Sequence, residues 1–154
     1  MRIAVFSDSH GNCDNMVQAV EILRPDHILH LGDGWRDAEK LAERFPAIQL
    51  TRVAGNCDFG AEGERELLLC LGGKTLFLAH GHTLGVKSSL IRAYYTAQEK
   101  GADILLHGHT HMPYIDERGG IWMMNPGSIG DYRRPSYGLL TIEGDKILPS
   151  LYVL

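Results

Sequence analysis

Seven residues of types that bind metal ions recur at regular places along the chain. Each follows a short apolar segment, and most lie beside a glycine. In chain order they are Asp8, His10, Asp33, Asn56, His80, His109 and His111. Carboxylate, amide and imidazole groups without a thiolate favour Mn, Fe, Co, Ni or Zn over Ca. The set therefore predicts a site for transition-metal or zinc ions.

The spacing and the number of these residues predict how many ions bind. Asp8 and His10 are two residues apart, as are His109 and His111. Alternate residues of an extended segment point to the same side. Seven side chains exceed the needs of one four-coordinate ion and fall one short of two separate ions. If Asp33 bridges, two ions each receive four protein bonds and keep open positions for water and substrate.

The elements that must position these residues begin with two strand–loop–helix units. Apolar runs at 3–6 and 28–31 predict buried strands, and apolar residues at helical spacing predict helices through 16–23 and 38–45. Consecutive units of this kind imply parallel strands joined by right-handed crossovers. Because ligands of open α/β sheets bind at the carboxyl ends of strands, the polar residues are expected to meet at one edge.

After a strand expected at 48–53, the chain no longer follows the strand–loop–helix pattern. Segments 67–71 and 76–79 flank Gly72-Gly73-Lys74, which indicates a hairpin, and a long helix is expected from 86 to 97 with Gly101 as its end. Further strands are expected at 104–106, 114–115, 121–124, 137–142 and 147–153. The sheet is therefore mixed or double, in one α/β domain spanning residues 1–154.

Composition narrows the range of partners. The 154 residues carry a formal net charge of −4 and a pI near 6.0, which favours a small phosphorylated substrate over a stable nucleic-acid partner. No segment resembles a signal peptide or membrane span. Three widely spaced cysteines, Cys13, Cys57 and Cys70, suit a reducing compartment, so we expect a cytoplasmic protein. The oligomeric state is left open, with a homo-oligomer as one alternative.

At this point the motifs resemble those of a known family. Asp8-Ser9-His10, Gly32-Asp33, Gly55-Asn56, His80 and Gly108-His109-Thr110-His111 occur in the order of the calcineurin-like metallophosphoesterase signature, followed by Asn125-Pro126-Gly127-Ser128. The short length and Gly55-Asn56-Cys57-Asp58 are most similar to compact bacterial and archaeal phosphodiesterases of the YfcE type. The resemblance covers residues 3 to about 128.

The resemblance implies an α/β fold, a four-layer α/β/β/α sandwich of two mixed sheets. One metal would be held by Asp8, His10, Asp33 and His111, and the other by Asp33, Asn56, His80 and His109. It further implies a bridging hydroxide that attacks a phosphodiester of a small or nucleotide-like substrate. The cofactors would be two divalent metal ions, and Mn is favoured over Ni, Co, Fe and Zn. Three residues are predicted to act in catalysis as well: Asp33, Asn56 and His80.

One position departs from the wider family, which usually has His directly after the motif Asn. Here that residue is Cys57. A thiol is a weak proton donor, so diesters with good leaving groups are the expected substrates. Asp58 could orient a neighbour. The alternative function is a protein-interaction scaffold on the same fold, like the retromer subunit that resembles these enzymes, although here no candidate ligand is missing.

The remaining candidates are given roles by their positions. Asn12 could cap the first helix or bind substrate phosphate, His82 could face the substrate, and Arg133 could bind phosphate or be solvated. Five residues in or beside apolar segments are expected to serve packing: His30, Trp35, His107, Met123 and Met124.

Overall fold

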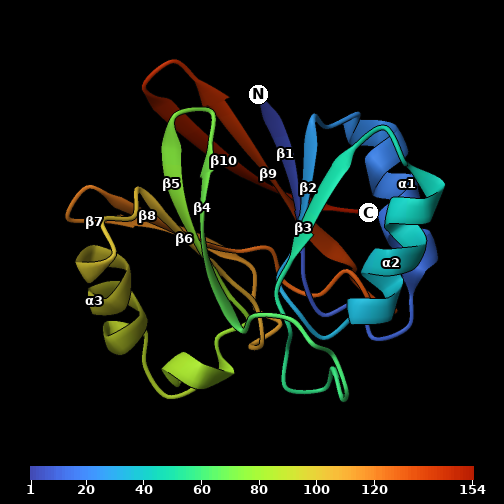
Figure 1. Cartoon of the computed structure of the whole chain (residues 1–154), viewed down its shortest axis with the longest axis horizontal. Coiled ribbons are helices and arrows are strands. Elements are labelled where there is room, and N and C mark those ends of the chain that lie inside the picture. The colour runs from blue at the N-terminus through green and yellow to red at the C-terminus, as the bar shows by residue number, and fades with distance from the viewer.

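Two five-stranded sheets pack face to face, with helices on their outer faces, in the computed structural model of residues 1–154 (Figure 1). The first sheet has the order β10 (Lys146–Val153), β9 (Ser136–Glu143), β1 (Arg2–Phe6), β2 (His27–His30) and β3 (Gln49–Arg52). The second has the order β4 (Glu66–Leu71), β5 (Lys74–Ala79), β6 (Ile104–His107), β8 (Ile121–Asn125) and β7 (Tyr114–Arg118). The expected α/β/β/α sandwich of two mixed sheets is confirmed.

Each sheet has a parallel centre and antiparallel margins. Strands β1, β2 and β3 are parallel, as are β5, β6 and β8, whereas β9, β10, β4 and β7 run antiparallel to their neighbours. The parallel strands of both sheets end at the lower edge in Figure 1, where the connecting loops gather. The site residues of the sequence therefore emerge from two sheets at one common edge.

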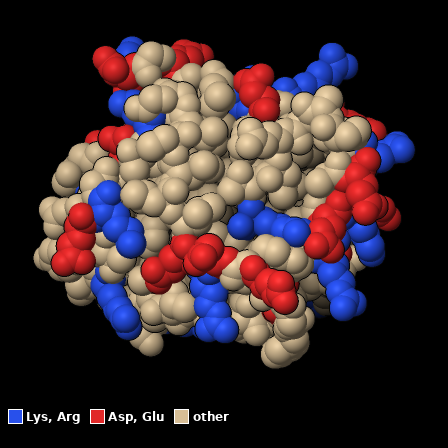
Figure 2. Space-filling model, viewed as in Figure 1, with Lys and Arg blue, Asp and Glu red and all other residues tan.

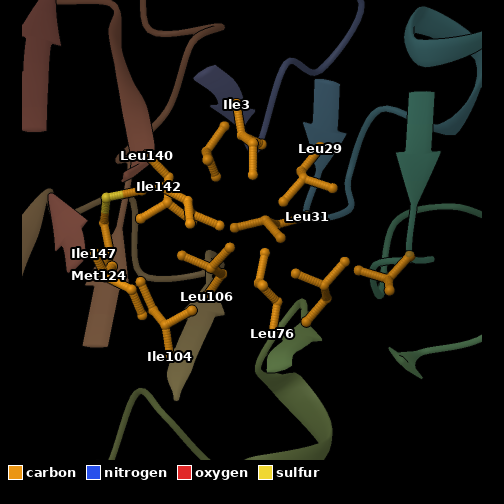
Figure 3. Packing of buried hydrophobic residues seen from close by; sticks show 13 residues of the cluster. Ile3, Leu29, Leu31, Leu76, Ile104, Leu106, Met124, Leu140, Ile142 and Ile147 are labelled. Atoms are coloured by element: carbon orange, nitrogen blue, oxygen red, sulfur yellow. The ribbon is translucent and has the colours of Figure 1, made fainter. Parts of the chain in front are cut away.

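The space between the sheets is filled by an apolar core of buried side chains (Figure 3). Strand β1 shows how alternation builds it, because Ile3 and Val5 face the second sheet. Ala4 and Phe6 point the other way, into a second core that includes Met16 of helix α1 (Cys13–Leu23). Met123 and Met124 are both completely buried, which confirms their predicted packing role.

Three helices cover the outer faces. Helices α1 and α2 (Trp35–Arg44) lie against the first sheet, and α3 (Ile91–Glu99) lies against the second (Figure 1). Helix α1 begins after Asn12, whose side chain accepts a hydrogen bond from the backbone N–H of Asn15 at 3.3 Å. The capping role predicted for Asn12 is thus confirmed.

The helix expected from residue 86 was too long. The segment after β5 forms a 3₁₀ turn, η1 (His82–Leu84), and α3 begins only at Ile91. Gly85 ends this 3₁₀ turn with a left-handed φ of 64°, and residues 85–88 form a further turn before α3. Val86 and Leu90 nevertheless pack into the same core as α3, so their apolar spacing reflects burial in a loop and helix rather than one helix.

Acidic and basic side chains are interspersed over the face shown in Figure 2, without an extended area of one sign. None of the helices is both long and apolar enough to cross a lipid bilayer.

Candidate metal centre

Six of the seven candidate ligands converge where the loops of the two sheets meet. Asp8, His10 and His111 form one group whose ligating atoms lie within 4.8 Å of one another, and Asp33, His80 and His109 form a second. His10 lies between the groups, because its Nε2 is 3.7 Å from Asp8 Oδ1 and 3.8 Å from Asp33 Oδ2. The two clusters are therefore adjacent parts of one site.

The seventh candidate, Asn56, lies on the loop after β3 at the same edge. Its side chain is exposed, and its Nδ2 donates to Cys57 Sγ at 3.5 Å. The loop itself contacts the site, since the backbone N–H of Cys57 donates to Asp33 Oδ1 at 2.8 Å. A ligand role for Asn56 stays a prediction.

The backbone of the site is held in an unfavourable conformation. The protein has six non-glycine residues with positive φ, and Arg24, after α1, is the only one outside the site. The other five are Asp8, His10, Asp33, His109 and His111, with φ between 45° and 70°. Such conformations cost on the order of 1–2 kcal/mol each and persist where the surroundings enforce them. The strain is concentrated on the candidate ligands, as expected of a functional site.

His80 is completely buried and oriented by the first sheet. Its Nδ1 donates to the carbonyl oxygen of Leu31 at 2.8 Å, which directs Nε2 into the site. That nitrogen lies 3.4 Å from Asp33 Oδ2 and 3.1 Å from His109 Nδ1. An imidazole held through its other nitrogen to a backbone carbonyl is the usual arrangement of a metal ligand.

Asp8 is also completely buried, and its two oxygens have different tasks. Oδ2 accepts hydrogen bonds from Ser7 Oγ at 2.5 Å and from the backbone N–H of His109 at 3.1 Å. Oδ1 faces the site, 3.1 Å from His111 Nε2. Burial raises the pKa of the Asp8 carboxyl, but the bonds from His111 and Ser7 and the charge of His80 outweigh it and lower the pKa. The carboxylate is therefore ionised and oriented for a cation.

The imidazole pKa values shift in opposite directions within the cluster. Burial and the nearby charge of His80 lower the pKa of His109 to about 4. Burial also acts to lower the pKa of His80, yet its hydrogen bond to Asp33 and the charge of Asp8 raise it overall. The raised pKa of His80 reflects the negative charge of the two carboxylates, which a bound cation would also balance. The donor set, its orientation and its charge fit divalent metal ions.

Asp58 ties together the two loops that carry Asp33 and Asn56. Its Oδ2 accepts from the backbone N–H groups of Asp33 at 2.8 Å and Gly55 at 2.7 Å, and its Oδ1 accepts from Gly34 and Trp35, both at 2.9 Å. The last two bonds satisfy the amino end of α2, where Gly34 has no capping side chain. Asp58 thus positions the loops of the site. The sequence suggested that Asp58 could orient a neighbouring residue but did not identify that residue.

A second carboxylate, which the sequence did not single out, holds the loop on both sides of His10. Asp37 on α2 is buried, and its Oδ2 accepts from Ser9 Oγ at 2.6 Å and from the N–H of Gly11 at 2.8 Å. Ser9 Oγ also lies 3.1 Å from His30 Nε2. His30 is buried as predicted, and it also supports the site loop.

Glycines admit the close contacts between loops. A Cβ on Gly55 would lie 2.1 Å from Asp33 Oδ1, and one on Gly108 would lie 2.7 Å from Asp8 Oδ2. The carboxyl end of β8 adds further support, because Ser128 Oγ donates to the Asp8 carbonyl oxygen and Asn125 Nδ2 donates to that of Gly108. The Asn125–Ser128 motif therefore contacts the site through the backbone.

The other candidates lie near the cluster to different degrees. His82 is adjacent, with its ring 5.4 Å from that of His80, and both of its ring nitrogens are buried without a hydrogen-bond partner. Arg133 lies on an exposed loop, with its guanidinium 5.4 Å from the centre of the Tyr132 ring. His107 is buried, with Nε2 2.7 Å from the Tyr114 hydroxyl, as a packing role requires. Substrate contacts by Asn12, His82 and Arg133 stay predictions.

An open groove of about 750 Å³ extends from the cluster. It starts at His10, Asp33 and Cys57, which form a third group of ligating atoms within 4.8 Å. It then runs between the first half of α2 and the loop 57–61. Trp35 lines the groove, but its ring is stacked by the Arg52 guanidinium at 3.7 Å and contacted by Gly63. The predicted packing role of Trp35 is therefore correct, although the residue also forms part of the wall.

The fold and this cluster define a metallophosphoesterase, and comparisons with known proteins agree. Residues 1–145 match the calcineurin-like phosphoesterase superfamily domain, and the chain belongs to this family. It is similar to the probable metallophosphoesterase YsnB of Bacillus subtilis, at 36% identity over 99% of this chain and 90% of the relative. It is also similar to the phosphodiesterase YfcE of Escherichia coli, at 30% identity over 91% of this chain and 87% of the relative. The resemblance predicted from the motifs is confirmed.

The fold is also shared with proteins that are not named as phosphoesterases. The crystal structure of Vps29 of Entamoeba histolytica complexed with zinc matches with a TM-score of 0.84 and 24% identity, covering 99% of this chain and 92% of that chain. At this identity the likeness concerns the fold.

Asp58 can be tested as the residue that positions the site. Asp58→Ala leaves four backbone N–H groups without their acceptor, so we expect a loss of about 2 kcal/mol or more in the free energy of unfolding. We also expect a fall of roughly tenfold or more in metal affinity. The control Asp103→Ala removes the acceptor of one N–H, that of Thr75, away from the site. Titration of metal into both variants would contradict the role if their affinities were equal.

Proposed function

We propose that this protein is a dinuclear metal-dependent phosphodiesterase that hydrolyses a small or nucleotide-like substrate. The observation that carries the proposal is the pair of adjacent ligand groups, one around Asp8 and one around Asp33, with His10 within 4 Å of both carboxylates. One ion would be held by Asp8, His10, Asp33 and His111. The other would be held by Asp33, Asn56, His80 and His109.

The chemistry of the site follows from these groups. When bound, two divalent ions supply an activated water as nucleophile and offset the charge of the phosphoryl oxygens. The protein holds the donors rigidly, since Asp8, Asp33 and His80 are buried and each is anchored by backbone hydrogen bonds. Such preorganisation places the reacting groups without further rearrangement. Asp33, Asn56 and His80 are the proposed catalytic groups, and Asn12, His82 and Arg133 the proposed substrate contacts.

The preference for diesters rests on Cys57. Cys57 is an exposed thiol next to Asp33, and a thiol is a weak proton donor. An alkoxide leaving group needs a proton as the P–O bond breaks, whereas a nitrophenolate needs little help. A site without an effective acid at this position favours substrates with good leaving groups.

The wider setting is part of the same proposal. Residues 1–154 act as one domain, and the three free cysteines support a cytoplasmic location. No stable nucleic-acid or membrane partner is proposed, and a homo-oligomer is compatible with the site. The second candidate function is a protein-interaction scaffold, favoured by the fold shared with Vps29. The intact donor set favours catalysis.

Metal removal tests catalysis directly. Protein stripped by a chelator should lose hydrolysis of bis(p-nitrophenyl) phosphate, and Mn²⁺, Ni²⁺ or Co²⁺ should restore it better than Mg²⁺, because imidazoles prefer such ions. Mn²⁺ is the proposed native ion. Equal rates in excess chelator and in Mn²⁺ would contradict metal catalysis, and no hydrolysis with any ion would favour the scaffold.

Asp33→Asn tests the bridging position. The change weakens the bonds to both ions, so metal content and turnover should fall further than in His111→Ala, which removes one bond from one ion. Metal analysis beside the rate on the aryl diester is the measurement. The assignment would be wrong if Asp33→Asn kept two ions per chain and normal turnover.

Cys57 tests the preference for diesters. Cys57→Ala should change the rate on an activated aryl diester less than about tenfold, and Cys57→His should raise the rate on alkyl monoesters, since a general acid contributes roughly 10² to 10⁴-fold. Cys70→Ala, at an exposed cysteine on β4, is the matched control. A hundredfold loss in Cys57→Ala at equal metal content would show that the thiol takes part directly.

A further inference from the structure

The groove beside the metal centre contains two basic side chains that have no acidic partner. Arg36 and Lys40 of α2 line the groove, and both are exposed. The ion pairs that lysine or arginine form in this protein are Arg52 with Glu39 and Arg118 with Asp116. Arg36 and Lys40 therefore carry free positive charge next to the site.

The carboxylates of the groove are already engaged. Asp37 accepts from Ser9 Oγ and the N–H of Gly11, and Asp58 accepts four backbone hydrogen bonds. Glu39 is paired with Arg52 at 3.0 Å. Asp33, at the mouth of the groove, belongs to the metal centre. Beyond that centre, Arg36 and Lys40 are the charged side chains of the groove that have neither an ion pair nor a hydrogen bond to the protein and can donate to a ligand.

The placement of the two side chains suits a dianion. Residues four apart lie on one face of a helix, about 6 Å apart along its axis. A guanidinium and an ammonium at this spacing can both reach one phosphate group, which carries a charge of about −1.5 to −2 at neutral pH. A carboxylate, with one charge, would match the pair less well.

We propose that this groove binds a second phosphate group of the substrate. The natural substrate is then a phosphodiester in which one substituent carries an additional phosphate monoester, an inference that rests on the proposed phosphodiesterase function. The reacting phosphorus lies at the His10 and Asp33 end, and the second phosphate lies against Arg36 and Lys40. Phe59, 88% exposed on the opposite wall, offers an apolar surface to the group between the two phosphates.

Two chromogenic diesters that differ by one phosphate test the proposal. Thymidine 5′-(p-nitrophenyl phosphate) has no second phosphate, and its 3′-phosphorylated form has one. The Mn²⁺-loaded protein should prefer the phosphorylated form by roughly tenfold in kcat/KM, mainly through KM. Arg36→Gln/Lys40→Gln should abolish the preference and leave the rate on the unphosphorylated diester within about twofold. Arg92→Gln/Lys146→Gln, with the same change of charge at exposed positions outside the groove, should keep it.

A binding measurement separates this proposal from the proposed function. By calorimetry, thymidine 3′,5′-bisphosphate should bind the Mn²⁺-loaded protein roughly tenfold tighter than thymidine 5′-phosphate, and the groove variant should lose the difference. Equal binding of both nucleotides by the unaltered protein, or a preference that survives in the groove variant, would overturn the proposal. If neither diester is cleaved yet the binding difference is present, the phosphodiesterase function fails and the phosphate site stands.

Discussion

The apolar contact between the two sheets is the constraint on which the site depends. Asp8, His10 and Asp33 come from loops of the first sheet, and His80, His109 and His111 from loops of the second. The distances between these two halves are set by the close-packed side chains between the sheets, such as Leu31 and Leu106 (Figure 3). Since Leu31 also accepts the hydrogen bond from His80 Nδ1, packing and ligand orientation meet in one residue.

Charge and backbone strain at the site are balanced by a surrounding shell of hydrogen bonds. Five candidate ligands have left-handed backbone conformations, and two carboxylates lie close together in a buried cluster. Asp37 and Asp58 hold the loops in place by accepting backbone and hydroxyl hydrogen bonds. The free energy of folding thus supports an arrangement that becomes electrostatically favourable when cations bind.

The same two carboxylates influence the neighbouring groove. Asp37 and Asp58 accept hydrogen bonds from the protein's own backbone and hydroxyl groups and form no ion pair with Arg36 or Lys40, which line the same cavity. Anchoring of the metal-site loops and exposure of positive charge therefore have a common structural origin. An anionic substrate would meet the metal centre at one end of the groove and these two side chains further along α2.

The sequence by itself determined the ligand types, the pairs spaced two apart, the parallel units and the family, because these depend on local order and on short-range periodicity. It also located the strands, most clearly β1, β2 and β6, which contain continuous apolar runs. Tertiary structure decided that Asp58 reaches Asp33 and Gly55, that α3 starts only at Ile91, and that Arg36 and Lys40 line a groove. The contacts of Asp58 and the lining of the groove join segments distant in the chain, and α3 is preceded by a turn over 85–88. No local pattern encodes the distance between two sheets that is set by their shared core.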